Sequence, residues 1–98
     1  MIDEALAERA AQVFFDATAG GDWPRPATEI QDDGEFVLLM VHVPRVWDRT
    51  EPSNEERRTI VNALNSVLPI PRDEPLGCWM VVFLRDGNVY ESILSNEF

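Results

Sequence analysis

The chain has 98 residues, a length that suits one domain spanning residues 1–98 and leaves no room for two. Hydrophobic residues make up 45% and charged residues 27%, which is ordinary globular usage and excludes a chain disordered throughout. The formal net charge of −10 argues against direct binding of nucleic acid or of an anionic membrane, because phosphate binding requires lysine or arginine.

The cellular location is predicted from the cysteine count and from the start of the chain. The single cysteine, Cys78, excludes an intramolecular disulfide and is typical of a reducing compartment. The first ten residues contain Asp3, Glu4 and Glu8, whereas a secretory signal begins with positive charge and an apolar run. The longest apolar stretch, residues 36–41, is too short to span a bilayer. We therefore expect a cytoplasmic protein without membrane attachment.

The first predicted element is a helix over residues 3–18, ended by Gly20-Gly21. Phe14 flanks its apolar stripe, whereas Phe15 falls on the opposite side of the helical wheel. There Phe15 is either a second packing contact or an exposed anchor for a partner. The predicted stripe consists of Ile2, Leu6, Ala10, Val13 and Ala17, and the neighbours of Phe15 are Glu4, Glu8 and Ala11.

A hairpin follows the helix and a loop. Residues 28–31 and 36–43 are predicted strands, and Asp33-Gly34 between them has the residues of a tight turn. The second strand is apolar almost throughout, so both of its faces should be at least partly buried.

The second half repeats the order of helix and hairpin. Ser53 and Glu56 form a predicted capping box at the start of a helix that ends before Pro69. Strands over 78–84 and 89–94 are joined at Asp86-Gly87, in a register that places Tyr90 opposite Phe83 and Ile93 opposite Met80.

The predicted fold is an α+β domain in the order α-β-β-α-β-β, with two helices packed on one face of a mostly antiparallel four-stranded sheet. Strand 78–84 carries large apolar side chains on both of its faces. Helices on one side only would leave one of these sets uncovered, which predicts a homodimer or a bound partner.

Candidate catalytic groups are few, and we expect no enzyme, no cofactor and no bound metal. His42 is the only histidine and is interpreted as a buried or half-buried sheet residue, and Cys78 as an inert core thiol. The run Asp32-Asp33-Gly34-Glu35 lacks the spacing of a calcium loop. A small enzyme using His42 or Cys78 is the weakest of the functional alternatives.

The acidic residues suggest the leading hypothesis. Residues 1–35 contain nine acidic residues against two arginines, and such a surface attracts basic proteins. We therefore expect an inhibitor, of the anti-restriction, anti-CRISPR or immunity-protein type, that occupies the basic surface of a partner in a nucleic-acid-binding complex. Tryptophan in arginine-flanked loops adds interface candidates, although the favoured interpretation of each ring is that it caps the edge of the core. The predicted partner-binding residues are Asp32, Asp33, Glu35, Glu29, Trp23, Trp47 and Phe15.

The alternative hypothesis is a chaperone-like or housekeeping dimer that binds through the apolar sheet face. In element order and acidity the chain resembles acidic secretion chaperones, which are dimers with helices on one side of a sheet. The resemblance lies in topology alone and includes no shared motif.

Overall fold

The computed structural model describes residues 3–18, 23–31, 36–46, 51–68 and 79–97. The helices are α1 (Glu4–Ala17) and α2 (Asn54–Asn65), and the strands are β1 (Ala27–Ile30), β2 (Val37–His42), β3 (Trp79–Arg85) and β4 (Asn88–Leu94). The predicted α+β class and the order α-β-β-α-β-β are confirmed.

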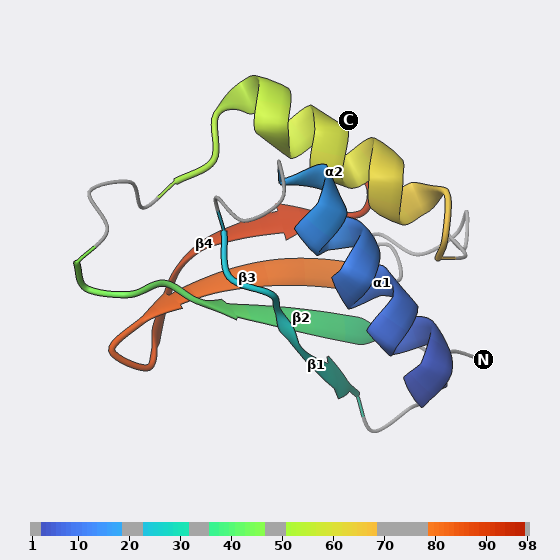
Figure 1. The fold of residues 1–98 in the computed structure, drawn as a ribbon, viewed down its shortest axis with the longest axis horizontal. Coiled ribbons are helices and arrows are strands. Elements are labelled where there is room, and N and C mark those ends of the chain that lie inside the picture. Colours follow the sequence, from blue (N-terminus) through green and yellow to red (C-terminus); the bar gives the residue numbers. More distant parts are fainter. Residues whose placement is uncertain (1–2, 19–22, 32–35, 47–50, 69–78, 98) are drawn as a thin grey trace.

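The four strands form one mixed sheet in the order β1-β2-β3-β4. The β1–β2 and β3–β4 pairs are antiparallel, as expected for hairpins, whereas β2 and β3 run parallel. A parallel pair needs a crossover connection, and α2 lies in that connection. Both helices lie over one face of the sheet (Figure 1). The sheet is therefore antiparallel at its two edges and parallel at its centre.

Asp3 caps the N-terminus of helix α1, and its side chain accepts a hydrogen bond from the backbone N–H of Leu6 at 2.9 Å. The buried stripe of the helix differs from the predicted one, because α1 packs against both α2 and β1 and so buries a wider arc. Ala11, predicted on the polar side, is fully buried, and Phe14 lies in the core rather than at the edge of the stripe.

Helix α2 begins with the predicted capping box, which is confirmed. The Ser53 hydroxyl accepts from the Glu56 N–H at 3.2 Å, and the Glu56 carboxylate accepts from the Ser53 N–H at 2.9 Å. Ile60, Val61 and Leu64 form its buried stripe.

The core lies between the helices and one face of the sheet. Phe83 lies at its centre, with the ring of Trp23 edge-on at 5.2 Å and the ring of Phe14 at 6.5 Å between centroids. Below α2, the indole N–H of Trp79 donates to the side-chain oxygen of Asn65 at 2.9 Å. This bond satisfies the polar end of a ring that is otherwise buried.

The β3–β4 hairpin turns at Asp86-Gly87 as predicted, with φ of +56° and +82°. Two positive φ values define the type I′ turn, whose twist matches that of the strands. The predicted register is wrong beyond this turn. Leu84 pairs with Val89 but Phe83 pairs with Glu91, so Tyr90 is the extra residue of a β-bulge.

An ion pair joins this turn to the loop after β2. The Arg45 Nε donates to both carboxylate oxygens of Asp86, at 2.8 and 3.0 Å. The hydrogen bond from Arg45 holds the pKa of Asp86 below its ordinary value.

Replacing Arg45 by alanine should raise the pKa of Asp86, because it removes that hydrogen bond. A carboxylate whose pKa is lowered in the folded state stabilises the fold above its unfolded pKa and loses this effect as the pH falls through the folded pKa. Carbon-detected NMR titration of the Asp86 carboxyl in both proteins measures the change, and identical titration curves would contradict the pairing.

Among the described residues, no helix is both long enough and apolar enough to cross a bilayer.

Candidate functional site

Several of the predicted partner-binding residues lie outside the described residues. These are Asp32, Asp33, Glu35 and Trp47, and the same holds for Cys78 among the candidate catalytic groups. The prediction that these acids form a hairpin tip is therefore not tested by the structure.

The predicted aromatic anchors are not all on the surface. Trp23 is only 1% exposed and packs on Phe83, so its ring is part of the core and has no surface to offer a partner. Of the two interpretations of this tryptophan, the structure favours the one in which it completes the core. Phe15 is half-buried on α1, and part of its ring remains accessible.

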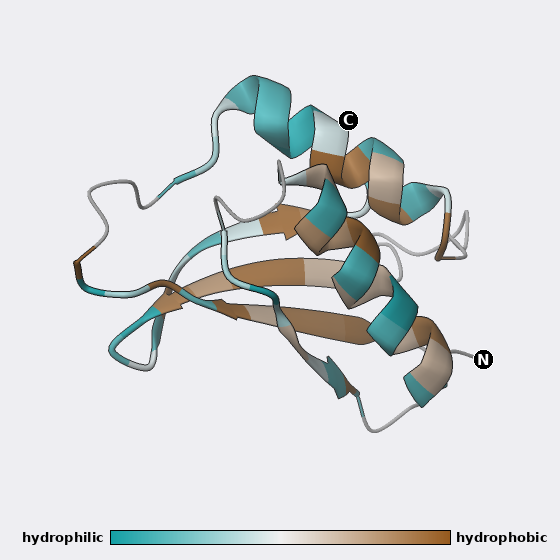
Figure 2. Ribbon diagram, viewed as in Figure 1, coloured by the Kyte–Doolittle hydropathy of each residue, from teal (hydrophilic) through white to brown (hydrophobic). Residues whose placement is uncertain are grey.

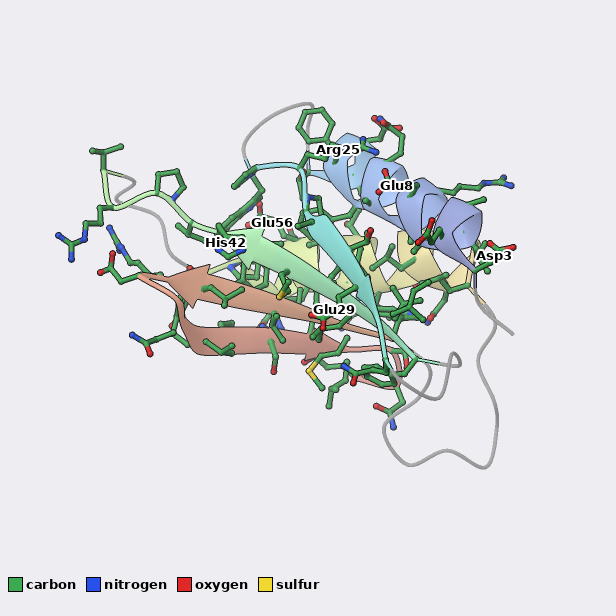
Figure 3. All side chains as sticks on the ribbon, turned by 90° about the horizontal axis from the view of Figure 1, so that it is seen from below. Asp3, Glu8, Arg25, Glu29, His42 and Glu56 are labelled. Carbon is green, nitrogen blue, oxygen red and sulfur yellow. The ribbon has the colours of Figure 1, made fainter. Side chains whose placement is uncertain are left out.

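Glu29 and the acids of α1 lie on opposite sides of β1. In the β1–β2 register Glu29 pairs with Leu38, whose side chain points away from the helices, whereas Thr28 pairs with the buried Leu39. Figure 3 shows Asp3 and Glu8 on α1 and Glu29 apart from them on the sheet. The described acidic residues of the first 35 positions, which are close in sequence, therefore lie on two separate surfaces.

One of these surfaces is a groove of about 460 Å³ between α1 and β1. Glu4 and Glu8 come from successive turns of the helix, since residues four apart share a helix face. The residues that line the groove are Glu4, Ala7, Glu8, Thr28 and Ile30. We call it the α1–β1 groove: it combines carboxylates with apolar side chains.

A chain of polar contacts borders the groove. Glu8 accepts from Arg25 Nη2 at 3.2 Å and from the Thr28 hydroxyl at 3.3 Å, and Arg25 also donates to Gln12. The side chains of Glu8 and Arg25 are 64% and 41% exposed. Exposed pairs of this kind contribute only about 0.2–1 kcal/mol, so Arg25 can be replaced by another cation at little cost.

Two further arginines of the described residues form ion pairs within the fold. Arg45 is held by Asp86, and Arg57 by Glu97 and Glu91, with Arg57 Nη2 also donating to the Ser92 carbonyl at 2.7 Å. The hydrogen bond to Glu97 raises the pKa of Arg57, against the opposing effect of burial. In contrast, Glu4 and Glu29 have no ion-pair or hydrogen-bond partner among the residues described, so negative charge faces outward.

The second surface is the face of the sheet that points away from the helices, which we call the open face. No described helix or strand lies over it (Figure 1), and the central strands β2 and β3 are hydrophobic along most of their length (Figure 2). Seven of its eleven side chains are leucine, methionine or valine. The open face consists of Ala27, Glu29, Leu38, Met40, His42, Met80, Val82, Leu84, Val89, Ser92 and Leu94.

The candidate catalytic histidine lies on the open face. His42 is exposed at the end of β2, so the prediction of a buried or half-buried side chain is wrong. The strand alternation turns it away from the core, which leaves its ring in water. Within the described ranges, no group of three or more His, Cys, Asp or Glu side chains could hold a metal ion.

The α1–β1 groove was not among the sequence-based candidates. The sequence shows that Glu4 and Glu8 share one face of a helix, but it contains no signal that β1 lies beside this face. Alternation in β1 predicts that Thr28 and Ile30 share a side, and only the packing of α1 decides which side that is.

Comparison with known proteins adds no relative: no family model, no curated protein and no solved structure matches this chain at a significant level.

Proposed function

We propose that the chain is an acidic protein-binding domain that occupies a basic surface of a partner protein. The observation that carries the proposal is the α1–β1 groove, in which Glu4 and Glu8 stand over Ala7 and Ile30. The net charge of −10 supports it, since a large net charge steers oppositely charged partners and speeds their encounter.

The groove suits an arginine or lysine side chain of the partner. The apolar stem of such a side chain packs on apolar surface while its charged end reaches carboxylates. The half-buried Ile30 offers the apolar contact, and Glu4 and Glu8 offer the acceptors. A guanidinium can pair with two carboxylate oxygens at once, which favours arginine over lysine.

In its most specific form the proposal describes an inhibitor of a nucleic-acid-handling protein. The basic surface of such a partner binds phosphates, and carboxylates that occupy it exclude the nucleic acid. Asp32, Asp33 and Glu35 remain proposed as a second group of phosphate mimics. The chain then acts by occupying a surface and performs no catalysis.

The proposal predicts that a Glu4→Gln, Glu8→Gln variant binds a basic peptide at least about tenfold more weakly than the wild type. The matched control is Glu51→Gln, Glu55→Gln, which removes the same charge from two exposed positions, one before α2 and one in its first turn. Fluorescence anisotropy of a short labelled arginine-rich peptide measures both, at about 50 mM and about 500 mM salt. Equal losses of affinity in the two variants would mean that only the net charge matters, and would contradict a binding site in the groove.

Two further measurements sharpen this test. Arg25→Ala should strengthen peptide binding, because it removes the cation that competes for Glu8, and Arg9→Ala, which removes an exposed charge from the same helix, should strengthen it less. The inhibitor form also requires that the chain release a short DNA duplex from the same peptide. Peptide binding without release of the DNA would contradict the inhibitor proposal but would still support a protein-binding domain.

A further inference from the structure

The open face consists of three rows of side chains across the sheet. The strand registers place residues of neighbouring strands side by side, and the central row divides the face in two. The rows are Glu29-Leu38-Met80-Leu94, then Ala27-Met40-Val82-Ser92, then His42-Leu84-Val89.

This composition is unlike that of a sheet face in water. Antiparallel sheets with one solvated face carry polar side chains there, in alternation with the apolar side chains of the core. Here Leu38, Met40 and Met80 are half-buried and Val89 is 57% exposed, whereas Val82 and Leu84 are only 6% and 8% exposed. Burial of these side chains by a further protein surface would be favourable.

Glu29 and His42 are the two titratable residues of the open face, and they lie in its first and third rows. Four residues of β2 separate these rows, about 13 Å at the rise of a strand, so the two side chains of one copy are too far apart to pair. Figure 3 shows them well separated along the sheet. Any partner that covers the face must satisfy a carboxylate at one end and an imidazole at the other.

We propose that the open face is the interface of a homodimer in which Glu29 of each copy pairs with His42 of the other. A symmetric dimer uses the same patch on both copies, so the patch must complement itself. A two-fold axis that crosses the strands at the central row exchanges the first and third rows. Met40 then lies over its own equivalent, and each Glu29 comes to lie beside the second copy's His42.

The other in-plane axis, along the strands, is unfavourable. It keeps each row in place and exchanges the edges of the sheet, so Glu29 would lie over Leu94 of the second copy. A carboxylate buried there would lose its water without gaining a partner. The crossing axis is therefore the arrangement that satisfies both the apolar rows and the two polar ends.

The size of the face limits the strength of such a dimer. Four strands about 4.8 Å apart, over four to seven residues each, give a footprint of roughly 400 Å² when the sheet is treated as a flat surface. Two such faces bury roughly 800 Å² in total, which is the size of a weak or transient interface, and the apolar composition is that of homodimers. We expect dissociation in the micromolar range, with sheets packed face to face and both helix layers outside.

Sedimentation equilibrium of the wild type from about 1 to about 200 µM tests the dimer. The mass should rise from 11.1 kDa towards twice that value and should persist at about 0.5 M salt, since apolar contacts dominate. A mass that stays at 11.1 kDa over the whole range overturns the proposal. The assay uses no basic peptide, so its outcome is independent of the α1–β1 groove.

Variants locate the interface. Met40→Glu should remain monomeric at all concentrations, with an unchanged far-UV circular dichroism spectrum, whereas Thr59→Glu on the exposed side of α2 should dimerise like the wild type. Dimerisation of a folded Met40→Glu protein overturns the assignment of this face.

The pair of Glu29 and His42 allows a rescue experiment even if Met40→Glu fails to fold. His42 is exposed, and His42→Glu sets two carboxylates together across the proposed interface, which should weaken the dimer at least about tenfold. Adding Glu29→Arg to His42→Glu should restore dimerisation, because opposite charges meet again. Failure of the double variant to recover overturns the crossing axis.

Discussion

Replacing Phe83 by alanine is expected to destabilise the fold by about 4 kcal/mol. Phe83 is fully buried, and its ring contacts both Phe14 and Trp23. Truncation removes the hydrophobic transfer energy of the ring and leaves a cavity between α1 and the sheet, which rigid neighbours fill only in part. Because small domains are stable by only about 5–15 kcal/mol, a large fraction of the total stability depends on this residue.

Urea unfolding followed by tryptophan fluorescence measures this loss, since Trp23 lies against the substituted ring. The matched control is Val46→Ala, which truncates a side chain that is 86% exposed and should change stability by less than about 0.5 kcal/mol. Similar losses in the two variants would mean that Phe83 is not at the centre of the core.

Arg57→Ala is expected to cost about 2–3 kcal/mol, the larger part from the two carboxylates that it leaves behind. The guanidinium donates to Glu97, with Nε at 2.9 Å, and lies 3.5 Å from Glu91. The side chains of Arg57, Glu97 and Glu91 are 14%, 23% and 29% exposed. The loss of stability should therefore be smaller than for a fully buried ion pair. Through these two ion pairs, Arg57 links α2 to Glu91 of β4 and to Glu97 in the segment that follows β4.

Two substitutions separate charge from geometry at this position. Arg57→Lys keeps the charge but lacks the planar fork, so it should recover only part of the stability. Arg25→Ala removes an exposed arginine and should cost less than about 1 kcal/mol. A loss for Arg57→Ala as small as that for Arg25→Ala would contradict the structural role of Arg57.

The elements that the sequence predicted correctly have local causes. The capping box of Ser53 and Glu56 and the Asp86-Gly87 turn depend on residues within four positions of each other, so pattern alone identifies them. The predicted β3–β4 register was wrong because the structure has a bulged residue, Tyr90, which shifts every later pair of the two strands by one residue. The bulge places Glu91 on the helix side, where it meets Arg57.

Tertiary packing decides what the sequence could not show about the candidate sites. Trp23, directly before Pro24-Arg25-Pro26, could be a surface anchor or a cap on the core edge from sequence alone, and the structure places it against Phe83. Glu29 looks like part of one acidic cluster until strand alternation turns it onto the open face. In both cases the direction of a side chain follows from its neighbours across the sheet, which are distant in sequence.

The two proposed surfaces lie on opposite sides of the sheet and are compatible with each other. Thr28 and Ile30 of the α1–β1 groove face the helices, whereas the proposed dimer uses the other face. Each dimer would then present two grooves on its outer sides. A partner with two basic sites, or a basic partner that is itself a dimer, would bind with the added avidity of linked sites.

Chemical-shift mapping tests the central claim most directly. The arginine-rich peptide is titrated into the isotope-labelled chain at low salt, and the backbone amide shifts are followed by NMR. Binding in the α1–β1 groove predicts the largest shifts at Glu4, Ala7, Glu8, Thr28 and Ile30. Shifts concentrated on the open face, or spread evenly over all acidic residues, would contradict a basic-side-chain site between α1 and β1.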